Sequence, residues 1–142
     1  MDAVTLASLA QLFFSEPFPQ DQATGLLGPI ASQERGNLHL TPKPQWECRQ
    51  ITLETKELKS GKTAIVGISL TFTKPIRLSL RELTDEWGNA TPKPRLKPTQ
   101  PTPFQFLFKT PNWQGYALVD INQADPGAGA VPRIFLRRQE LE

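Results

Sequence analysis

The clearest pattern in the chain is an alternation of apolar and polar side chains over residues 62–73. One side holds Ala64, Val66, Ile68, Leu70 and Phe72, and the other holds Thr63, Ile65, Gly67, Ser69 and Thr71. A period of two is typical of a β-strand with one buried face. Residues 48–58 alternate in the same way, and a turn at residues 59–61 separates the two stretches. Together they predict a β-hairpin.

Further strands are predicted on both sides of this hairpin. Residues 37–41 form a short alternating stretch. Residues 104–108 place three phenylalanines on one side, and residues 116–121 return after a turn at residues 110–115. Residues 133–138 are expected to form the last strand, at an edge of the sheet, because charged side chains protect exposed edges.

Two helices are predicted before the first strand. Asp2 is a suitable N-cap for a helix over residues 3–14, where apolar side chains recur every three or four positions. A second, shorter helix is expected between Pro19, which suits a first helical turn, and Gly28, which suits a helix end.

A third helix has the strongest local signal. Ser79 and Glu82 have the spacing of a capping box, in which each side chain accepts a hydrogen bond from the other residue's backbone N–H. Gly88 follows at the expected end, so a two-turn helix is predicted over residues 80–87.

These elements predict a single α+β domain over residues 1–142. The N-terminal helices and the short capped helix are expected to pack on a mainly antiparallel sheet. The expected core is Leu6, Leu9, Phe13, Leu53, Val66, Ile68, Leu70, Leu83, Trp87, Phe106 and Leu118. A helix that ends in glycine precedes strands in each half, at Gly28 and at Gly88, which leaves open whether the halves are a degenerate repeat.

A proline-rich segment at about residues 89–103 interrupts the pattern. Its prolines are Pro92, Pro94, Pro98, Pro101 and Pro103, and its basic residues are Lys93, Arg95 and Lys97. Because proline fixes φ and removes a backbone donor, the segment is predicted to be an extended, polyproline-like arm. Residues 95–101 also fit the basic-x-x-Pro-x-x-Pro pattern that aromatic-lined grooves bind, although a solvated connection remains the alternative.

Composition excludes several classes of protein. The net charge of +2 is too small by itself to indicate nucleic-acid binding. One cysteine permits neither an internal disulfide nor a cysteine-based zinc site, and no stretch approaches the roughly 20 apolar residues of a membrane span. No glycine-rich phosphate loop is found, so neither a cofactor nor a metal is expected. A cytoplasmic location is expected, or a periplasmic one if a leader has been removed.

His39 and Cys48 are the only conventional base and nucleophile in the chain. No spacing signature supports a catalytic pair, and a lone cysteine on a strand is usually a small buried apolar residue. The chain is therefore not expected to be an enzyme, and a small hydrolase that uses His39 and Cys48 is kept as an alternative.

Two short stretches resemble small envelope α+β domains of the BamE and beta-lactamase-inhibitor-protein type. Leu80, Leu83 and Trp87-Gly88 with Pro92 carry the resemblance, together with residues 22–29. The resemblance implies a helical pair on a curved antiparallel sheet. It also implies protein binding through the sheet face, without catalysis.

The resulting hypothesis is a soluble, non-catalytic protein-binding module of a bacterial immunity, adaptor or assembly-factor type. Loops on a rigid sheet are common recognition sites, and Trp and Arg are common anchors of interfaces. The residues expected to bind the partner are Lys93, Arg95, Lys97, Trp113 and Tyr116. The partner is expected to be one specific protein with acidic character. A nucleic-acid-binding accessory domain is the alternative, and a homodimer formed through an edge strand stays open.

Overall fold

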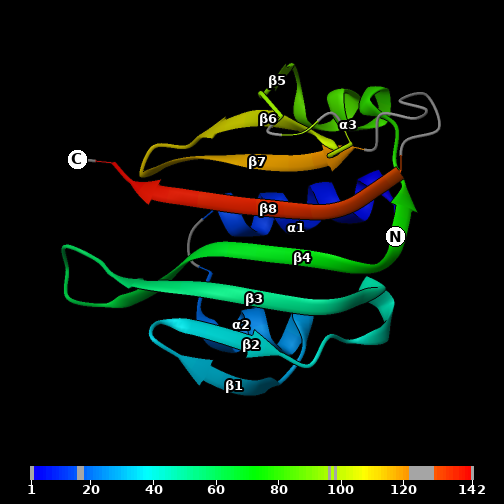
Figure 1. The fold of residues 1–142 in the computed structure, drawn as a ribbon. Helices are drawn as coiled ribbons and strands as arrows, with labels where there is room; N and C mark the ends of the chain where they lie inside the picture. The colour runs from blue at the N-terminus through cyan, green and yellow to red at the C-terminus, as the bar shows by residue number, and fades with distance from the viewer. Residues whose placement is uncertain (1, 16–17, 96, 98, 122–129, 142) are drawn as a thin grey trace.

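The computed structural model describes residues 2–15, 18–95, 97, 99–121 and 130–141. Its helices are α1 (Ala3–Phe14), α2 (Gln20–Leu27), the 3-10 turn η1 (Pro44–Trp46) and α3 (Leu80–Trp87). Its strands are β1 (Ile30–Glu34), β2 (Asn37–Leu40), β3 (Cys48–Glu57), β4 (Thr63–Arg77), β5 (Ala90–Pro92), β6 (Thr102–Lys109), β7 (Trp113–Ile121) and β8 (Ala130–Glu140). The predicted α+β class and antiparallel sheet are confirmed (Figure 1).

The helix boundaries follow the capping signals in the sequence. The side chain of Asp2 accepts a backbone N–H at the start of α1, and Ser79 and Glu82 form the predicted capping box of α3. Helix α2 ends at Gly28, where φ is 144° and a Cβ atom would lie 1.9 Å from the carbonyl oxygen of Thr41. All three predicted helices are confirmed, and their ends lie at the predicted capping residues.

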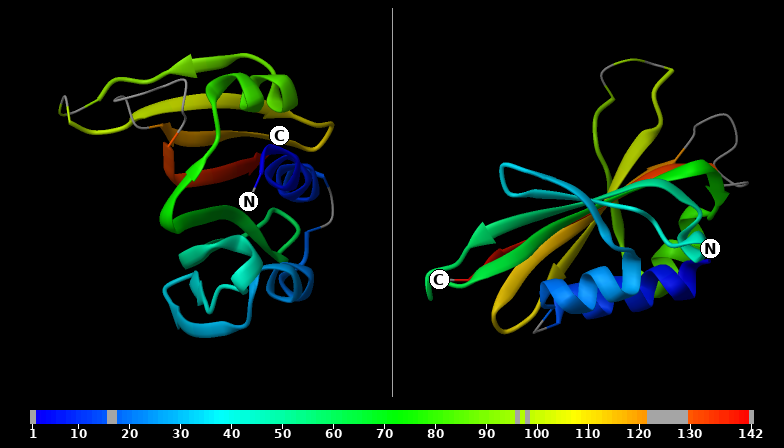
Figure 2. Two further views of the ribbon diagram at one scale, coloured as in Figure 1. Left: turned by 90° about the vertical axis from the view of Figure 1, so that its right-hand side faces the viewer. Right: turned by 90° about the horizontal axis from the view of Figure 1, so that it is seen from below.

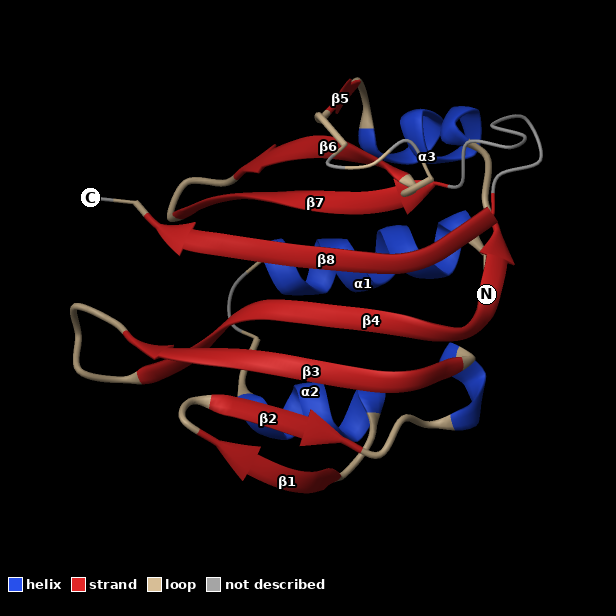
Figure 3. Cartoon of the chain, in the orientation of Figure 1, coloured by secondary structure: helices blue, strands red, loops and turns tan. Residues whose placement is uncertain are grey.

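The sheet consists of two meanders that meet at its centre. Its strand order is β1-β2-β3-β4-β8-β7-β6-β5, so strands β1 to β4 are consecutive and strands β5 to β8 mirror them (Figure 3). Short connections favour such antiparallel neighbours. A glycine-terminated helix precedes each meander, at Gly28 and at Gly88. The two halves thus share one order of elements.

Strand β8 lies at the centre of the sheet, and the prediction of an edge strand over residues 133–138 is wrong. Ile134 pairs with Leu70 of β4 on one side and with Val119 of β7 on the other. The arginines suggested a solvated edge, but the apolar side chains of Ile134 and Leu136 alternate with them and are buried. Pairing between distant segments decided the position of this strand.

Both N-terminal helices lie on one face of the twisted sheet (Figure 2). The buried side chains of that face form one core cluster with α1, α2 and α3. Of the expected core residues, these are buried in the cluster: Leu6, Leu9, Phe13, Leu53, Ile68, Leu70, Leu83 and Phe106. Trp87 is partly buried, and its ring lies edge-on to that of Phe106 with centroids 5.2 Å apart.

A bulge changes the side-chain directions in the first part of β4. Glu54 pairs with Gly67 and Thr55 pairs with Ile65, so Val66 has no partner in the register. An extra residue in one strand reverses the alternation beyond it. Ile65 therefore joins the core cluster, whereas Val66 is buried outside it. The predicted directions of these two side chains are wrong for this reason.

Strand β1 was not predicted. All five of its side chains are exposed, so residues 30–34 lack the alternation that marks the other strands. Strand β1 is an outer strand and pairs only with β2 among the described strands. Its pairing is specified by the backbone and by the following turn rather than by a buried face.

The contact between α1 and β7 requires a glycine. The ring of Phe14 stacks on that of Phe108, with centroids 4.3 Å apart and an angle of 11° between the rings. At Gly115, a Cβ atom would lie 2.7 Å from the Phe14 ring and 2.1 Å from the carbonyl oxygen of Arg137. The missing side chain at residue 115 lets the end of α1 lie directly on the sheet.

A buried arginine joins α1 to the centre of the sheet. Arg138 is 3% exposed, and its Nη1 donates to the carbonyl oxygen of Phe13 at 2.7 Å. Its Nε donates to the carbonyl oxygen of Ile65 in β4 at 2.9 Å. The guanidinium also lies 4.0 Å from the ring centroid of Trp113. The last carbonyls of a helix lack partners within it and carry partial negative charge, so a cation is favourable at this end of α1.

We predict that Gly115→Ala lowers the free energy of unfolding by about 1–3 kcal/mol or more, because the new methyl group overlaps backbone and ring atoms. Gly25→Ala is the matched control. Nothing lies within 4 Å of a Cβ atom at residue 25, in the interior of α2, so that change should stabilise the protein by up to about 1 kcal/mol. Urea unfolding measures both, and equal effects would contradict the described contact.

We also predict that Arg138→Leu destabilises the fold by about 2 kcal/mol or more. It leaves the buried carbonyl oxygens of Phe13 and Ile65 without this donor, and each such loss costs about 1–3 kcal/mol. Arg133→Leu is the control. The Arg133 side chain is 63% exposed, so its loss should cost no more than about 1 kcal/mol. Similar losses from both variants in urea unfolding would refute the role given to Arg138.

Candidate functional site

The face of the sheet opposite to α1 and α2 is the candidate site, and we call it the open face (Figure 2). Its side chains are set by the register of the strands. Leu107 pairs with Tyr116, and Tyr116 pairs with Arg137, so these three side chains form one row across β6, β7 and β8. The neighbouring row contains Leu118 paired with Phe135. No described helix lies over these rows.

Four side chains of the open face form what we call the apolar cluster: Leu107, Tyr116, Leu118 and Phe135. Leu107 is 72% exposed, and the other three are partly exposed. The rings of Tyr116 and Phe135 lie with centroids 6.3 Å apart. The prediction that Leu118 belongs to the helix-covered core is wrong, because the register places it on this face. Contiguous exposed apolar side chains of this kind commonly mark interaction sites.

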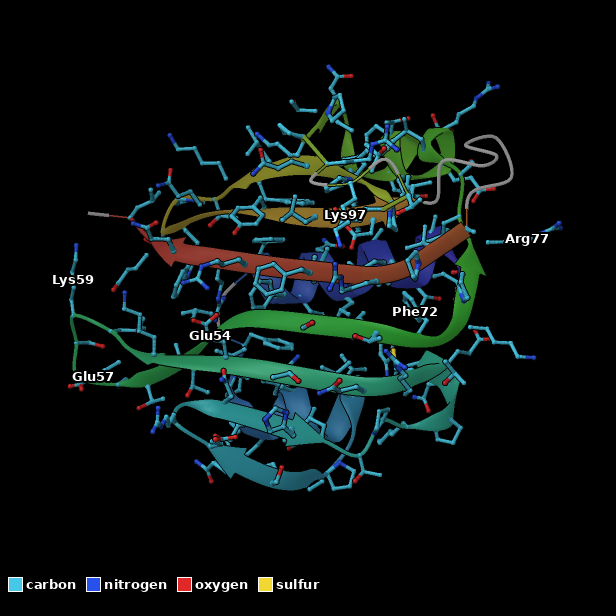
Figure 4. All side chains as sticks on the ribbon, in the orientation of Figure 1. Glu54, Glu57, Lys59, Phe72, Arg77 and Lys97 are labelled. Atoms are coloured by element: carbon cyan, nitrogen blue, oxygen red, sulfur yellow. The ribbon has the colours of Figure 1, made fainter. Side chains whose placement is uncertain are left out.

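Two ion pairs border the apolar cluster. Arg133 contacts Asp120, with 2.7 Å between Nη2 and Oδ2. Arg137 reaches across β4 to Glu54, with 2.6 Å between Nη1 and Oε2, and Figure 4 shows Glu54 in this region. A Cβ atom at Gly67 would lie 3.1 Å from that carboxylate oxygen, so the glycine leaves room for the pair. Exposed pairs contribute little stability, and their main effect here is to orient the arginines.

The other half of the open face is polar. The row that contains Phe135 continues through Ser69 and Thr52 to His39. Nδ1 of His39 lies 3.2 Å from the hydroxyl oxygen of Thr52, within hydrogen-bonding distance. The open face therefore divides into an apolar part over β6, β7 and β8 and a polar part over β2, β3 and β4.

The proline-rich segment is shorter and less extended than predicted. Strand β5 takes its first part and β6 its last part, which leaves residues 93–101 as the connection, here called the arm. The backbone N–H of Gln100 donates to the carbonyl oxygen of Lys97 at 3.1 Å, so the arm turns there. The prediction of one extended arm over residues 89–103 is wrong, because edge pairing and a local turn satisfy the backbone instead. Leu96 and Pro98 lie outside the described residues.

The arm projects from the sheet on the side of the open face (Figure 2). Its basic side chains, Lys93, Arg95 and Lys97, are exposed. Lys97 lies in front of the sheet, on the same side as the apolar cluster (Figure 4). The predicted basic residues and Tyr116 are thus on one side of the molecule.

Trp113 does not lie on this surface. The prediction placed it in a turn, but it is the first residue of β7, and it is 3% exposed beside Arg138. Sequence reasoning also missed Leu107 and Phe135, and it considered Arg137 only as part of a second basic patch or a solvated sheet edge. The alternation along residues 104–108 could have identified Leu107, whereas the other two required the central position of β8.

His39 and Cys48 do not come together as a catalytic pair. The thiol of Cys48 packs against the core and donates to the carbonyl oxygen of Trp46 at 3.3 Å, whereas His39 bonds to Thr52 on the open face. Burial, helped by the negative charge of Glu47, raises the pKa of the Cys48 thiol to about 12. The thiol is therefore protonated at neutral pH, and a protonated thiol is a poor nucleophile.

Comparison with known proteins gives no family for the chain. No protein-family model matches it, and neither does a curated protein or a solved structure. Within the described residues, no group of three His, Cys, Asp or Glu side chains could hold a metal ion. No described helix combines the length and apolar character needed to cross a bilayer. The sequence also predicts a glycine-containing loop over residues 125–130, of which residues 125–129 lie outside the described part of the chain.

We predict that Cys48 reacts with a disulfide reagent such as Ellman's reagent at pH 8 on the order of 100-fold more slowly in the folded chain than in urea. A pKa of about 12 leaves almost no thiolate at pH 8, whereas an unfolded cysteine keeps its ordinary pKa of 9.0. His39→Ala should leave the folded rate unchanged. A fast folded rate that falls in His39→Ala would instead indicate a catalytic pair.

Proposed function

We propose that the chain is a non-catalytic protein-binding module that holds one specific protein partner on the open face and the arm. The observation that carries the proposal is the apolar cluster, with Leu107 72% exposed, on a sheet face that no described helix covers. The other face is covered by helices, and Val4 and Leu12 are the exposed large apolar side chains of α1. An immunity, adaptor or assembly-factor role fits this arrangement.

The chemistry of the open face favours a protein as the partner. Aromatic residues and arginine are enriched at protein interfaces, and Tyr116, Phe135 and Arg137 provide these groups on neighbouring strands. The face is part of a continuous sheet, so binding does not require the backbone to become ordered. The resemblance to envelope α+β domains implies binding through a sheet face, and the position of the apolar cluster supports this proposal.

The charges of the arm favour an acidic partner. Lys93, Arg95 and Lys97 are exposed, and the arm that carries them projects on the side of the open face, so a partner with carboxylates around an apolar centre would complement this surface. Nucleic acid remains the alternative, since cations beside an exposed tyrosine also suit single strands, and its binding would fall steeply with salt. The cytoplasmic location remains a prediction.

Leu107→Asp should reduce capture of the partner at least tenfold, because it places a carboxylate on the most exposed position of the apolar cluster. The measurement is affinity capture of the tagged chain from its native lysate at moderate salt, quantified by mass spectrometry. Val4→Asp is the matched control, since Val4 is an apolar residue of α1 that is 62% exposed, and α1 lies on the opposite face. If both variants retain the partner, the open face is not the binding surface.

Replacing Arg95 and Lys97 together with glutamate should abolish capture without unfolding the domain. Both side chains are exposed, so circular dichroism should be unchanged, while an acidic partner would meet like charge. Unchanged capture would exclude the arm from the interface. If the unmodified chain enriches no protein, the protein-binding proposal itself fails.

A further inference from the structure

A hollow of about 350 Å³ lies on the open face near one end of β6, β7 and β8. Two neighbouring rows of paired residues form it, one with Leu107, Tyr116 and Arg137 and the other with Lys109, Gln114 and Gln139. Between these rows lies the row of Phe108, Gly115 and Arg138, whose side-chain positions face the helical layer, so only their backbone lies between the two rows on the open face. The volume lies within the range of about 300–1,000 Å³ that is usual for small-molecule sites.

The residues that line the hollow combine apolar and cationic groups. Leu107 and Tyr116 supply apolar surface, and Lys109 and Arg137 supply positive charge. Two glutamine side chains add neutral hydrogen-bonding groups, and no carboxylate is among the described lining residues. Such a site complements a ligand with an apolar body and one negative group.

The guanidinium of Arg137 is fixed by one ion pair, which uses only part of its hydrogen-bonding capacity. Nη1 bonds to the carboxylate of Glu54 at 2.6 Å, which fixes the position of the group from the β4 side. A guanidinium has five N–H donors, and within the described residues no hydrogen bond from Nε or Nη2 of Arg137 is found. These donors can bind a second anionic group without breaking the existing pair.

We propose that this hollow binds a small amphipathic anion, with an aromatic or aliphatic body against Leu107 and Tyr116 and a carboxylate or sulfonate at the guanidinium of Arg137. The inference goes beyond the proposed protein partner and does not depend on it. A bound anion would cover part of the apolar cluster, because Leu107 and Tyr116 belong to both surfaces.

The test uses two fluorescent probes that differ by one charged group. 8-Anilinonaphthalene-1-sulfonate carries a sulfonate, and N-phenyl-1-naphthylamine has the same ring system without it. Fluorescence titration of the folded full chain should show one saturable site for the sulfonate probe, with at least tenfold weaker binding of the neutral probe. Arg137→Gln should weaken binding of the sulfonate probe at least tenfold and leave the neutral probe within twofold.

Arg133→Gln is the matched control. Arg133 is also on β8 and also paired with a carboxylate, but it lines a different part of the open face, so binding should change less than twofold. Lys109→Gln provides a second variant in case Arg137→Gln unfolds, and it should weaken the sulfonate probe several-fold. Absence of saturable binding, equal binding of the two probes, or equal losses from Arg133→Gln and Arg137→Gln would each overturn the proposal.

Discussion

The guanidinium group of Arg138 lies where the helical layer meets the centre of the sheet, and it bonds to both. It donates to the carbonyl oxygen of Phe13 at the end of α1 and to that of Ile65 in β4. A buried charge is costly unless it is well bonded, and here backbone carbonyls and two aromatic rings surround it. Because its partners are backbone atoms, a leucine in its place would leave them without that donor. The position of α1 thus depends on a polar contact as well as on apolar packing.

This contact also determines which face of the sheet remains available. Successive residues of a strand point to opposite faces, so Arg138 enters the core while Arg137 stands on the open face. The same strand therefore fixes the helices on one side and contributes to the binding surface on the other. Two glycines make room for contacts on opposite faces of the sheet. Gly115 leaves space for the ring of Phe14 on the helix-covered face, and Gly67 leaves space for the pair of Arg137 with Glu54 on the open face.

Local signals in the sequence were sufficient for the helices and for the hairpin of β3 and β4. The capping box at Ser79, the glycine at residue 28 and the alternation over residues 62–73 each act within a few residues. The central position of β8 depends on pairing with β4 and β7, which no local pattern encodes, and its arginines suggested the opposite. The bulge at Val66 could not be predicted for the same reason.

The candidate site was predicted only in part. Tyr116 and the basic residues of the arm were named as candidates, since their aromatic and cationic side chains can be read directly from the sequence. Trp113 was misplaced, because its burial depends on Arg138, a residue far away in the sequence. Leu107 was missed and Arg137 was interpreted as an edge residue, since the two become neighbours of Tyr116 only through the register of three strands.

The most direct test of this account is photo-crosslinking inside the native cell. A photoreactive phenylalanine analogue would be placed at residue 107 on the open face and, in a second chain, at residue 4 on α1. The account predicts that residue 107 crosslinks to one dominant protein and that residue 4 does not. A crosslink to a protein from residue 4 alone would show that the helical layer is the binding surface and would contradict the account.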